Sequence, residues 1–130
     1  HIAAMCDQSG FLKGHSVGWP RAVFQGNVPR APVTEYNHKI AETWQYFDAV
    51  NFARKAKAAA IVSIGMIDST CPPCTNYAMF NVLPNPNKVT LDLPDVGHGF
   101  PGSVGNISEI LDTMVLEFLQ TGKVPPSPLK

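Results

Sequence analysis

The stretch Ala60-Ile-Val-Ser-Ile-Gly-Met-Ile-Asp68 decides how the chain folds. Its block Ile61–Ile67 is short, apolar and rich in β-branched residues, which is typical of a fully buried strand. Ser-Thr-Cys-Pro-Pro-Cys74 follows, and residues 72–83 have the length of a helix with Tyr77, Phe80 and Leu83 on one face.

A second strand is predicted over Asn87–Leu93, where apolar and polar residues alternate, and Pro-Asp-Val-Gly-His98-Gly follows it. Strand, helix and strand form a βαβ unit, whose crossover makes the two strands parallel. Parallel strands end at the same edge of a sheet, where open α/β sheets place their ligands. We therefore expect Asp68 and His98 to meet there, as the acid and histidine of a catalytic triad in the chain order of a hydrolase.

Further helices are predicted on both sides of this unit. Thr34 is a suitable cap for a helix to about Phe47, and a shorter one is expected from Asp48 to Lys57. The clearest helix follows Asn106 and ends at Gly122, because its apolar residues keep the i, i+3, i+4, i+7 spacing without a miss: Ile107, Ile110, Leu111, Met114, Val115, Phe118 and Leu119.

The two ends of the chain are expected to be irregular. His1–Met5 is interpreted as the end of a strand, residues 1–33 as mainly a long loop region, and Pro125–Lys130 as a loose tail. With residues 34–122 as an αβαβα unit, the fold class is α/β with about three parallel strands. Such a sheet is a poor independent fold, so the chain is interpreted as the C-terminal part of something larger.

Composition narrows the class of protein. The 130 residues are 45% hydrophobic and 15% charged, with a formal net charge of zero, which argues against a nucleic-acid partner. No apolar run reaches membrane-spanning length, so no membrane partner is expected. Three cysteines do not make a disulfide framework and leave a cytoplasmic and a secreted or periplasmic location equally open.

Two short motifs offer other chemistry. Gly14-His-Ser16-Val-Gly18 matches the nucleophile-elbow string, but no adequate strand precedes it, so Ser16 is interpreted as a polar loop residue. Cys71-Pro-Pro-Cys74 begins a helix, as the redox pair of a thiol–disulfide oxidoreductase would. A zinc site would need Cys71, Cys74, Cys6 and a histidine to converge. The expectation is no cofactor and no metal.

Aromatic residues are assigned by their surroundings in the sequence. The group Trp44, Tyr46, Phe47 and Phe52 is interpreted as core rather than as a sugar-binding platform. Trp19, in a loop, is the better candidate for contact with a substrate.

At several of these residues the chain resembles the acetylxylan esterases grouped with the cephalosporin-C deacetylases. The resemblance is most specific in three segments: Tyr46-Phe-Asp-x-x-Asn-x-Ala53, Ser63-Ile-Gly-Met-Ile-Asp-x-x-x-Pro-Pro73 and Gly97-His98, with Asn81 between the last two. Met5–Leu12 and Gly18-Trp-Pro20 also look like the loop after the sixth strand in related proteins. The resemblance implies an α/β-hydrolase fold in which Asp68 is the acid and His98 the histidine of the triad. It also implies that residues 1–130 are the C-terminal portion of one α/β-hydrolase domain.

The same resemblance places the nucleophilic serine, and the donors of the oxyanion hole, upstream of these 130 residues. The sequence departs from the family pattern at Gly99, where a glutamate is usual, at Ala59, where a proline is common, and at the two cysteines of the acid loop. For this reason, the alternative that the chain comes from a family member without catalytic activity stays open.

The resulting hypothesis is a carbohydrate esterase that hydrolyses acetyl esters by a Ser-His-Asp mechanism, present here as a fragment without its nucleophile and inactive alone. Its partner would be an acetylated saccharide or another small acetyl ester. Formation of a homo-oligomer, or association with the missing N-terminal half, is also possible under this hypothesis. The alternatives are an oxidoreductase using Cys71 and Cys74, and a non-catalytic α/β binding module.

Overall fold

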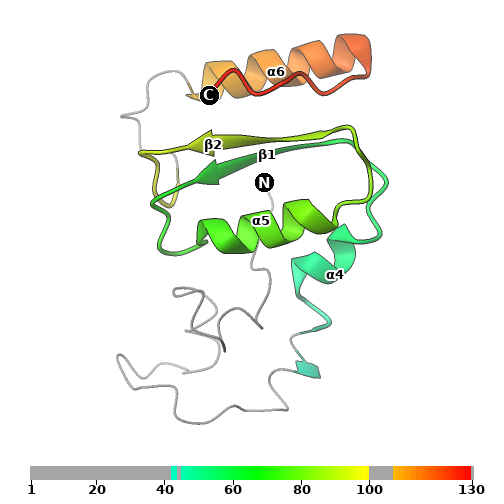
Figure 1. Cartoon of the computed structure of the whole chain (residues 1–130), viewed down its shortest axis with the longest axis vertical. Helices are drawn as coiled ribbons and strands as arrows, with labels where there is room; N and C mark the ends of the chain where they lie inside the picture. Colours follow the sequence, from blue (N-terminus) through cyan, green and yellow to red (C-terminus); the bar gives the residue numbers. More distant parts are fainter. Residues whose placement is uncertain (1–41, 44, 100–106, 130) are drawn as a thin grey trace.

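The computed structural model describes residues 42–43, 45–99 and 107–129. Its elements in chain order are α4 (Ala49–Ala53), β1 (Ala60–Gly65), α5 (Pro73–Val82), β2 (Lys88–Leu93) and α6 (Ile107–Thr121). The sheet lies between α5 and α6, with α4 beside α5 (Figure 1). The predicted α/β class is confirmed for two parallel strands alternating with helices. The third strand, predicted at His1–Met5, lies outside the described residues.

The two strands pair in parallel from Ala60 opposite Lys88 to Gly65 opposite Leu93. β1 ends at Gly65, two residues before the predicted end at Ile67. The chain turns there because the Met66 N–H donates to the Leu93 carbonyl at 3.0 Å and the Ile67 N–H to the Val96 carbonyl at 3.2 Å. These bonds direct the loop after β1 toward the loop after β2.

The prediction of a fully buried first strand is wrong. Ile64 is fully buried, but the other residues of β1 are only partly so. Within the described part of the chain, β1 pairs with a single neighbour, and its second edge lacks the cover that a central strand has.

The main apolar cluster fills the space between the sheet and α6. Leu91, Leu93, Val96, Ile107 and Met114 are buried there, and Ile61, Val89, Ile110 and Leu111 pack against them. The predicted helix is confirmed, but Val115 and Leu119 of its predicted inner face are exposed. A helix is about 10–12 Å wide, whereas two strands lie only about 4.8 Å apart, so the described sheet cannot cover the whole apolar surface of α6.

On the other face, α5 is held at both ends. It matches the predicted helix to within one residue, with Pro72 at its N-cap and Pro73 at its first position, where a missing N–H costs nothing. At the other end, the Lys88 ammonium donates to the carbonyls of Phe80 at 2.8 Å and Leu83 at 2.7 Å. Lys88 thereby caps a helix that has no basic residue in its own last turn.

The helix predicted from Asp48 to Lys57 is shorter than expected. Asp48 caps it by accepting a hydrogen bond from the Val50 N–H at 3.1 Å. The helix ends at Ala53, because the next N–H groups, of Lys55 and Ala56, bond to carbonyls three residues back and tighten the chain into turns.

The aromatic residues before and within α4 do not form a core. Tyr46, Phe47 and Phe52 are 77%, 67% and 60% exposed, so that interpretation is wrong for these three. Residues 45–47 form a turn, in which the Tyr46 N–H bonds to the Thr43 carbonyl at 3.2 Å, and the turn breaks the helical spacing on which the interpretation relied. Trp44 and most of the helix predicted from Thr34 lie outside the described residues.

The segment after α6 is anchored at its start rather than loose throughout. Asn87 donates to the Gly122 carbonyl at 3.0 Å and accepts from the Val124 N–H at 2.7 Å, and Pro125 is buried. Gly122 has a positive φ of 70° and ends α6 as predicted. Among the described helices, none is long and apolar enough to cross a membrane.

Candidate functional site

The Asp68 side chain is fixed by the loop that follows β1. Its Oδ1 accepts hydrogen bonds from the backbone N–H groups of Thr70 and Cys71, both at 2.8 Å. The side chain is only 11% exposed. One carboxylate oxygen is thus occupied by the loop itself, and the other, Oδ2, is left to bind a partner.

That partner is His98, as the sequence predicts. Nδ1 of His98 lies 3.1 Å from Oδ2 of Asp68, although the two residues are 30 positions apart in the chain. An ionised carboxylate can only accept, so Nδ1 carries the proton and donates, and Nε2 is left as the basic ring nitrogen. The His98 side chain is 53% exposed, which leaves the imidazole accessible to a reactant.

Gly65, the last residue of β1, lets the two loops approach each other. A Cβ atom at Gly65 would lie 2.6 Å from the Val96 carbonyl oxygen and 3.2 Å from that of Gly97. The sequence analysis missed this residue, and the available signal was a glycine at the end of an apolar strand. Gly99, next to His98, has a positive φ of 75° that favours glycine.

The two cysteines of the acid loop differ in their surroundings. Cys71 is buried and Cys74 is exposed. Burial, and then the negative charge of Asp68, raises the pKa of the Cys71 thiol above its ordinary value. The Cys71 sulfur belongs to a group with Asp68 and His98 whose potential ligand atoms all lie within 4.8 Å of one another. Cys74 is not in that group, and Cys6 of the predicted zinc set lies outside the described residues.

Two further polar side chains that the sequence analysis missed are Tyr77 of α5, whose hydroxyl lies 4.0 Å from the Met66 sulfur, and Asp92 of β2. Burial, followed by the hydrogen bond and the charge of Asp92, raises the pKa of the Tyr77 hydroxyl. Oδ1 of Asp92 is buried without a hydrogen-bond partner in the described part of the molecule. The alternation of the second strand placed Asp92 on the sheet, but nothing in the pattern indicated a tyrosine partner.

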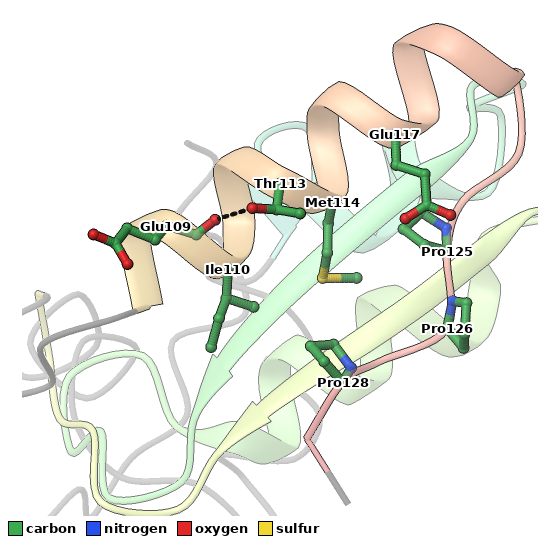
Figure 2. A pocket seen from close by; sticks show the side chains of 8 residues that line it. All are labelled: Glu109, Ile110, Thr113, Met114, Glu117, Pro125, Pro126 and Pro128. Carbon is green, nitrogen blue, oxygen red and sulfur yellow. Dashed lines mark hydrogen bonds between the residues drawn. The ribbon is translucent and has the colours of Figure 1, made fainter.

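The structure also has a groove between α6 and the C-terminal segment, with a volume of about 350 Å³ (Figure 2). Its lining is mainly apolar, with two glutamates and a threonine: Glu109, Ile110, Thr113, Met114, Glu117, Pro125, Pro126 and Pro128. The Thr113 hydroxyl is occupied by the Glu109 carbonyl at 2.7 Å. None of these residues belongs to the loops that carry Asp68 and His98, so the groove is separate from that pair.

Two residues considered in the sequence analysis are not placed by the structure. Ser16, the serine of the elbow string, and Trp19, the candidate for substrate contact, both lie outside the described residues. The described part of the site therefore comprises the carboxylate, the imidazole and the buried thiol beside them.

The chain is similar to two known acetyl esterases. It is 28% identical over 85 residues to the acetyl esterase Axe7A of Xylanibacter ruminicola, which is 65% of this chain and 18% of that protein. Its fold matches the structure of an acetyl xylan esterase from Paenibacillus sp. R4, with a TM-score of 0.64 and 24% identity, over 89% of this chain and 34% of that one. The chain thus spans about a fifth to a third of the length of these two relatives.

The family comparison covers the central unit and both of its loops. Residues 28–102, more than half of the chain, match the family described as acetyl xylan esterase (AXE1). This range includes both strands, the helix between them, and the loops in which Asp68 and His98 meet. The chain belongs to the acetyl xylan esterase (AXE1) family.

Proposed function

We propose that this chain supplies the acid and the histidine of a serine carbohydrate esterase that removes acetyl groups from a saccharide or another small acetyl ester. The observation that carries the proposal is the 3.1 Å contact between Oδ2 of Asp68 and Nδ1 of His98, at the common end of two parallel strands. Family membership supports the choice of an acetyl ester as the substrate.

In this mechanism His98 moves the protons. Its Nε2 takes the proton of a serine hydroxyl as the oxygen attacks the acetyl carbonyl, and then gives that proton to the departing sugar oxygen. The second half repeats these steps with water as the attacking group and releases acetate. Asp68 accepts the hydrogen bond from Nδ1, which keeps the imidazole in the required tautomer and stabilises the imidazolium.

The exposures of the two side chains suit these roles. A nearly buried carboxylate that is tied by two backbone N–H groups cannot rotate away from the imidazole, so it orients the ring at little entropic cost. The half-exposed imidazole keeps its other nitrogen accessible to a serine and a substrate. Metal or cofactor chemistry is not needed for any of these steps.

We place the nucleophilic serine, and with it the oxyanion-hole donors, outside these 130 residues, in the remainder of an α/β-hydrolase domain of which they form the C-terminal portion. The purified chain is then expected to hydrolyse p-nitrophenyl acetate no faster than its His98→Ala variant. Rapid hydrolysis that disappears in Ser16→Ala would contradict this placement and make Ser16 the nucleophile.

The catalytic roles are tested in a chimera in which this chain replaces the matching third of the Paenibacillus esterase, since the two folds superpose over that part. His98→Ala is expected to lower p-nitrophenyl acetate turnover by at least about 10³-fold, because the substitution removes the proposed general base. Asp95→Asn, an exposed carboxylate in the same loop, is the matched control and should leave turnover unchanged. Turnover in His98→Ala equal to that of the parent chimera would refute the proposal.

A second measurement uses the chain itself. A proton held between Nδ1 and a carboxylate gives a strongly downfield NMR resonance, which we expect from this chain and not from its Asp68→Asn or His98→Gln variants. Retention of the resonance in both variants would show that the Asp68–His98 hydrogen bond is not its source.

The surroundings of the cysteines disfavour the oxidoreductase alternative. A redox pair at a helix N-terminus relies on an accessible thiol with a lowered pKa. Cys71 has the opposite properties, because its sulfur is buried and the pKa of its thiol is raised. The contacts of Asp68 and His98 favour the esterase.

A further inference from the structure

We propose that Asp68, Cys71 and His98 form a binding site for a borderline or soft divalent cation such as Zn²⁺, which takes the position of the proton between the carboxylate and the imidazole. These residues offer one oxygen, one sulfur and one nitrogen ligand, all within 4.8 Å of one another. Zinc sites that keep an open position commonly use three protein ligands and a water molecule.

Two of the three ligand atoms are already at the required spacing. Bonds of about 2.0 Å to a tetrahedral metal place a nitrogen and an oxygen ligand about 3.3 Å apart. Nδ1 of His98 and Oδ2 of Asp68 are 3.1 Å apart. With a zinc–sulfur bond of about 2.3 Å, the sulfur should lie about 3.5 Å from the other two atoms. The sulfur lies within 4.8 Å of one ring nitrogen of His98 and one carboxylate oxygen of Asp68, so for those atoms the closure required is at most about 1.3 Å.

The loop prepares the site for such a cation. Oδ1 of Asp68 is occupied by the N–H groups of Thr70 and Cys71, so Oδ2 is the oxygen available as a ligand. The bond from the Cys71 N–H also ties the thiol-bearing residue to that same carboxylate. The half-exposed imidazole leaves a route for the metal and a place for a water ligand.

The set of ligands selects the class of metal. A thiolate and an imidazole favour Zn²⁺, Co²⁺ and Cd²⁺, whereas Mg²⁺ and Ca²⁺ prefer oxygen ligands throughout. When the metal binds, the thiol proton passes to solvent, and the ring proton of His98 moves from Nδ1 to Nε2, so that the lone pair of Nδ1 can bind the metal. This group differs from the set Cys71, Cys74, Cys6 and a histidine considered from the sequence, because the folded loop brings the carboxylate, not the second cysteine of the motif, to the sulfur.

Binding at this place would switch off the esterase, a consequence that rests on the proposed function, although the metal site itself does not. With its Nδ1 bound to the cation, His98 no longer donates to Asp68, and its Nε2 carries the ring proton and so cannot accept one from a serine. Zn²⁺ would therefore act as a reversible inhibitor that competes with a proton rather than with the substrate.

The test is a titration of the reduced chain with Co²⁺. Binding is monitored through the near-ultraviolet charge-transfer absorption of a thiolate–cobalt bond. We expect one equivalent to bind, and Cys71→Ala to abolish this absorption and weaken binding by more than the roughly 10- to 100-fold that the loss of an outer-shell partner costs. Cys74→Ala, the exposed cysteine three residues away, is the matched control and should retain both. His98→Gln, a change at a half-exposed position that the fold should tolerate, is expected to weaken binding to a similar degree.

An unaltered chain without the absorption, or an absorption that survives in Cys71→Ala, would overturn the proposal. In the chimera, inhibition by Zn²⁺ is measured as the ratio of turnover without Zn²⁺ to turnover with it. This ratio should fall toward one in Cys71→Ala but not in Cys74→Ala. Cobalt binding with an inactive chimera would refute the esterase and leave the metal site standing. An active chimera whose chain binds no cobalt would refute the metal site and leave the esterase standing.

Discussion

The two ends of the sheet are built from similar polar residues but use them differently. At the amino ends of the strands, Asn87 and Lys88 direct their side chains to backbone groups of the chain itself: the carbonyls of Gly122, Phe80 and Leu83, and the N–H of Val124. At the carboxyl ends, one oxygen of Asp68 also accepts from backbone N–H groups, but the other bonds to His98, and the imidazole is half exposed.

The difference separates structural from chemical roles. A side chain that bonds to backbone groups satisfies helix ends and loops that would otherwise be left unpaired, so its removal should lower stability. A pair of side chains that bond to each other, with a basic nitrogen left accessible, adds little to the fold and offers a proton acceptor. Substitutions at the amino ends of the strands should therefore lower stability, and substitutions at their carboxyl ends should lower activity. Substitutions at both ends of the sheet can test this division.

The largest effect is expected from Asp68→Asn. In the chimera it should lower p-nitrophenyl acetate turnover by about 10⁴-fold, because an amide cannot stabilise the imidazolium and favours the wrong tautomer of His98. The free energy of unfolding of the chain itself, measured with urea, should change by less than about 1 kcal/mol, since the amide oxygen still accepts from Thr70 and Cys71. A large loss of stability with little loss of turnover would show that Asp68 has a structural rather than a chemical role.

Gly65→Ala should lower both stability and turnover, because the loops that carry Asp68 and His98 approach each other beside Gly65. The new Cβ would lie 2.6 Å from a backbone oxygen, which cannot move as a flexible side chain can. We expect a loss of about 1–3 kcal/mol in the free energy of unfolding, together with lower turnover as the loop of His98 is pushed away from Asp68. Gly99→Ala meets no atom within 4 Å but carries the strain of a positive φ, so it separates backbone strain from this clash. Equal effects of the two substitutions on the Nδ1 proton resonance would contradict the explanation.

Asn87→Ala should lower the free energy of unfolding by about 1–2 kcal/mol and leave turnover unchanged. The substitution removes the two side-chain bonds that fasten the segment after α6, at 3.0 Å to Gly122 and 2.7 Å from Val124. Urea unfolding measures the loss, and Gln120→Ala on the exposed surface of α6 is the control. Reduced turnover without loss of stability would place Asn87 in the functional site.

The smallest effect is expected from Lys88→Met, which keeps the apolar stem and removes the ammonium group. The carbonyls of Phe80 and Leu83 then lose their donor, and we expect a loss of about 1 kcal/mol, because water can replace part of the interaction. Amide hydrogen exchange should rise mainly in the last turn of α5. Faster exchange spread evenly over the sheet would show that Lys88 does more than cap the helix.

Local patterns in the sequence predicted the βαβ unit well. The apolar run before Asp68, the two prolines at the start of α5, and Gly122 at the end of α6 each have a local cause, and the structure places each element within a few residues of its prediction. The aromatic group at Tyr46, Phe47 and Phe52 was misjudged, because apolar character indicates burial only where another element supplies a covering surface.

For the site, the sequence determined which side chains could meet. A parallel βαβ unit brings the residues after both strands to one edge, and this follows from chain connectivity alone. Only the tertiary structure decided how closely they approach. The 3.1 Å contact depends on Gly65 passing beside the Val96 carbonyl and on two N–H groups that hold one oxygen of Asp68. The position of the Cys71 sulfur beside this pair likewise depends on how the acid loop folds, and distances between loops that are remote in the chain are set by packing rather than by any local pattern of residues.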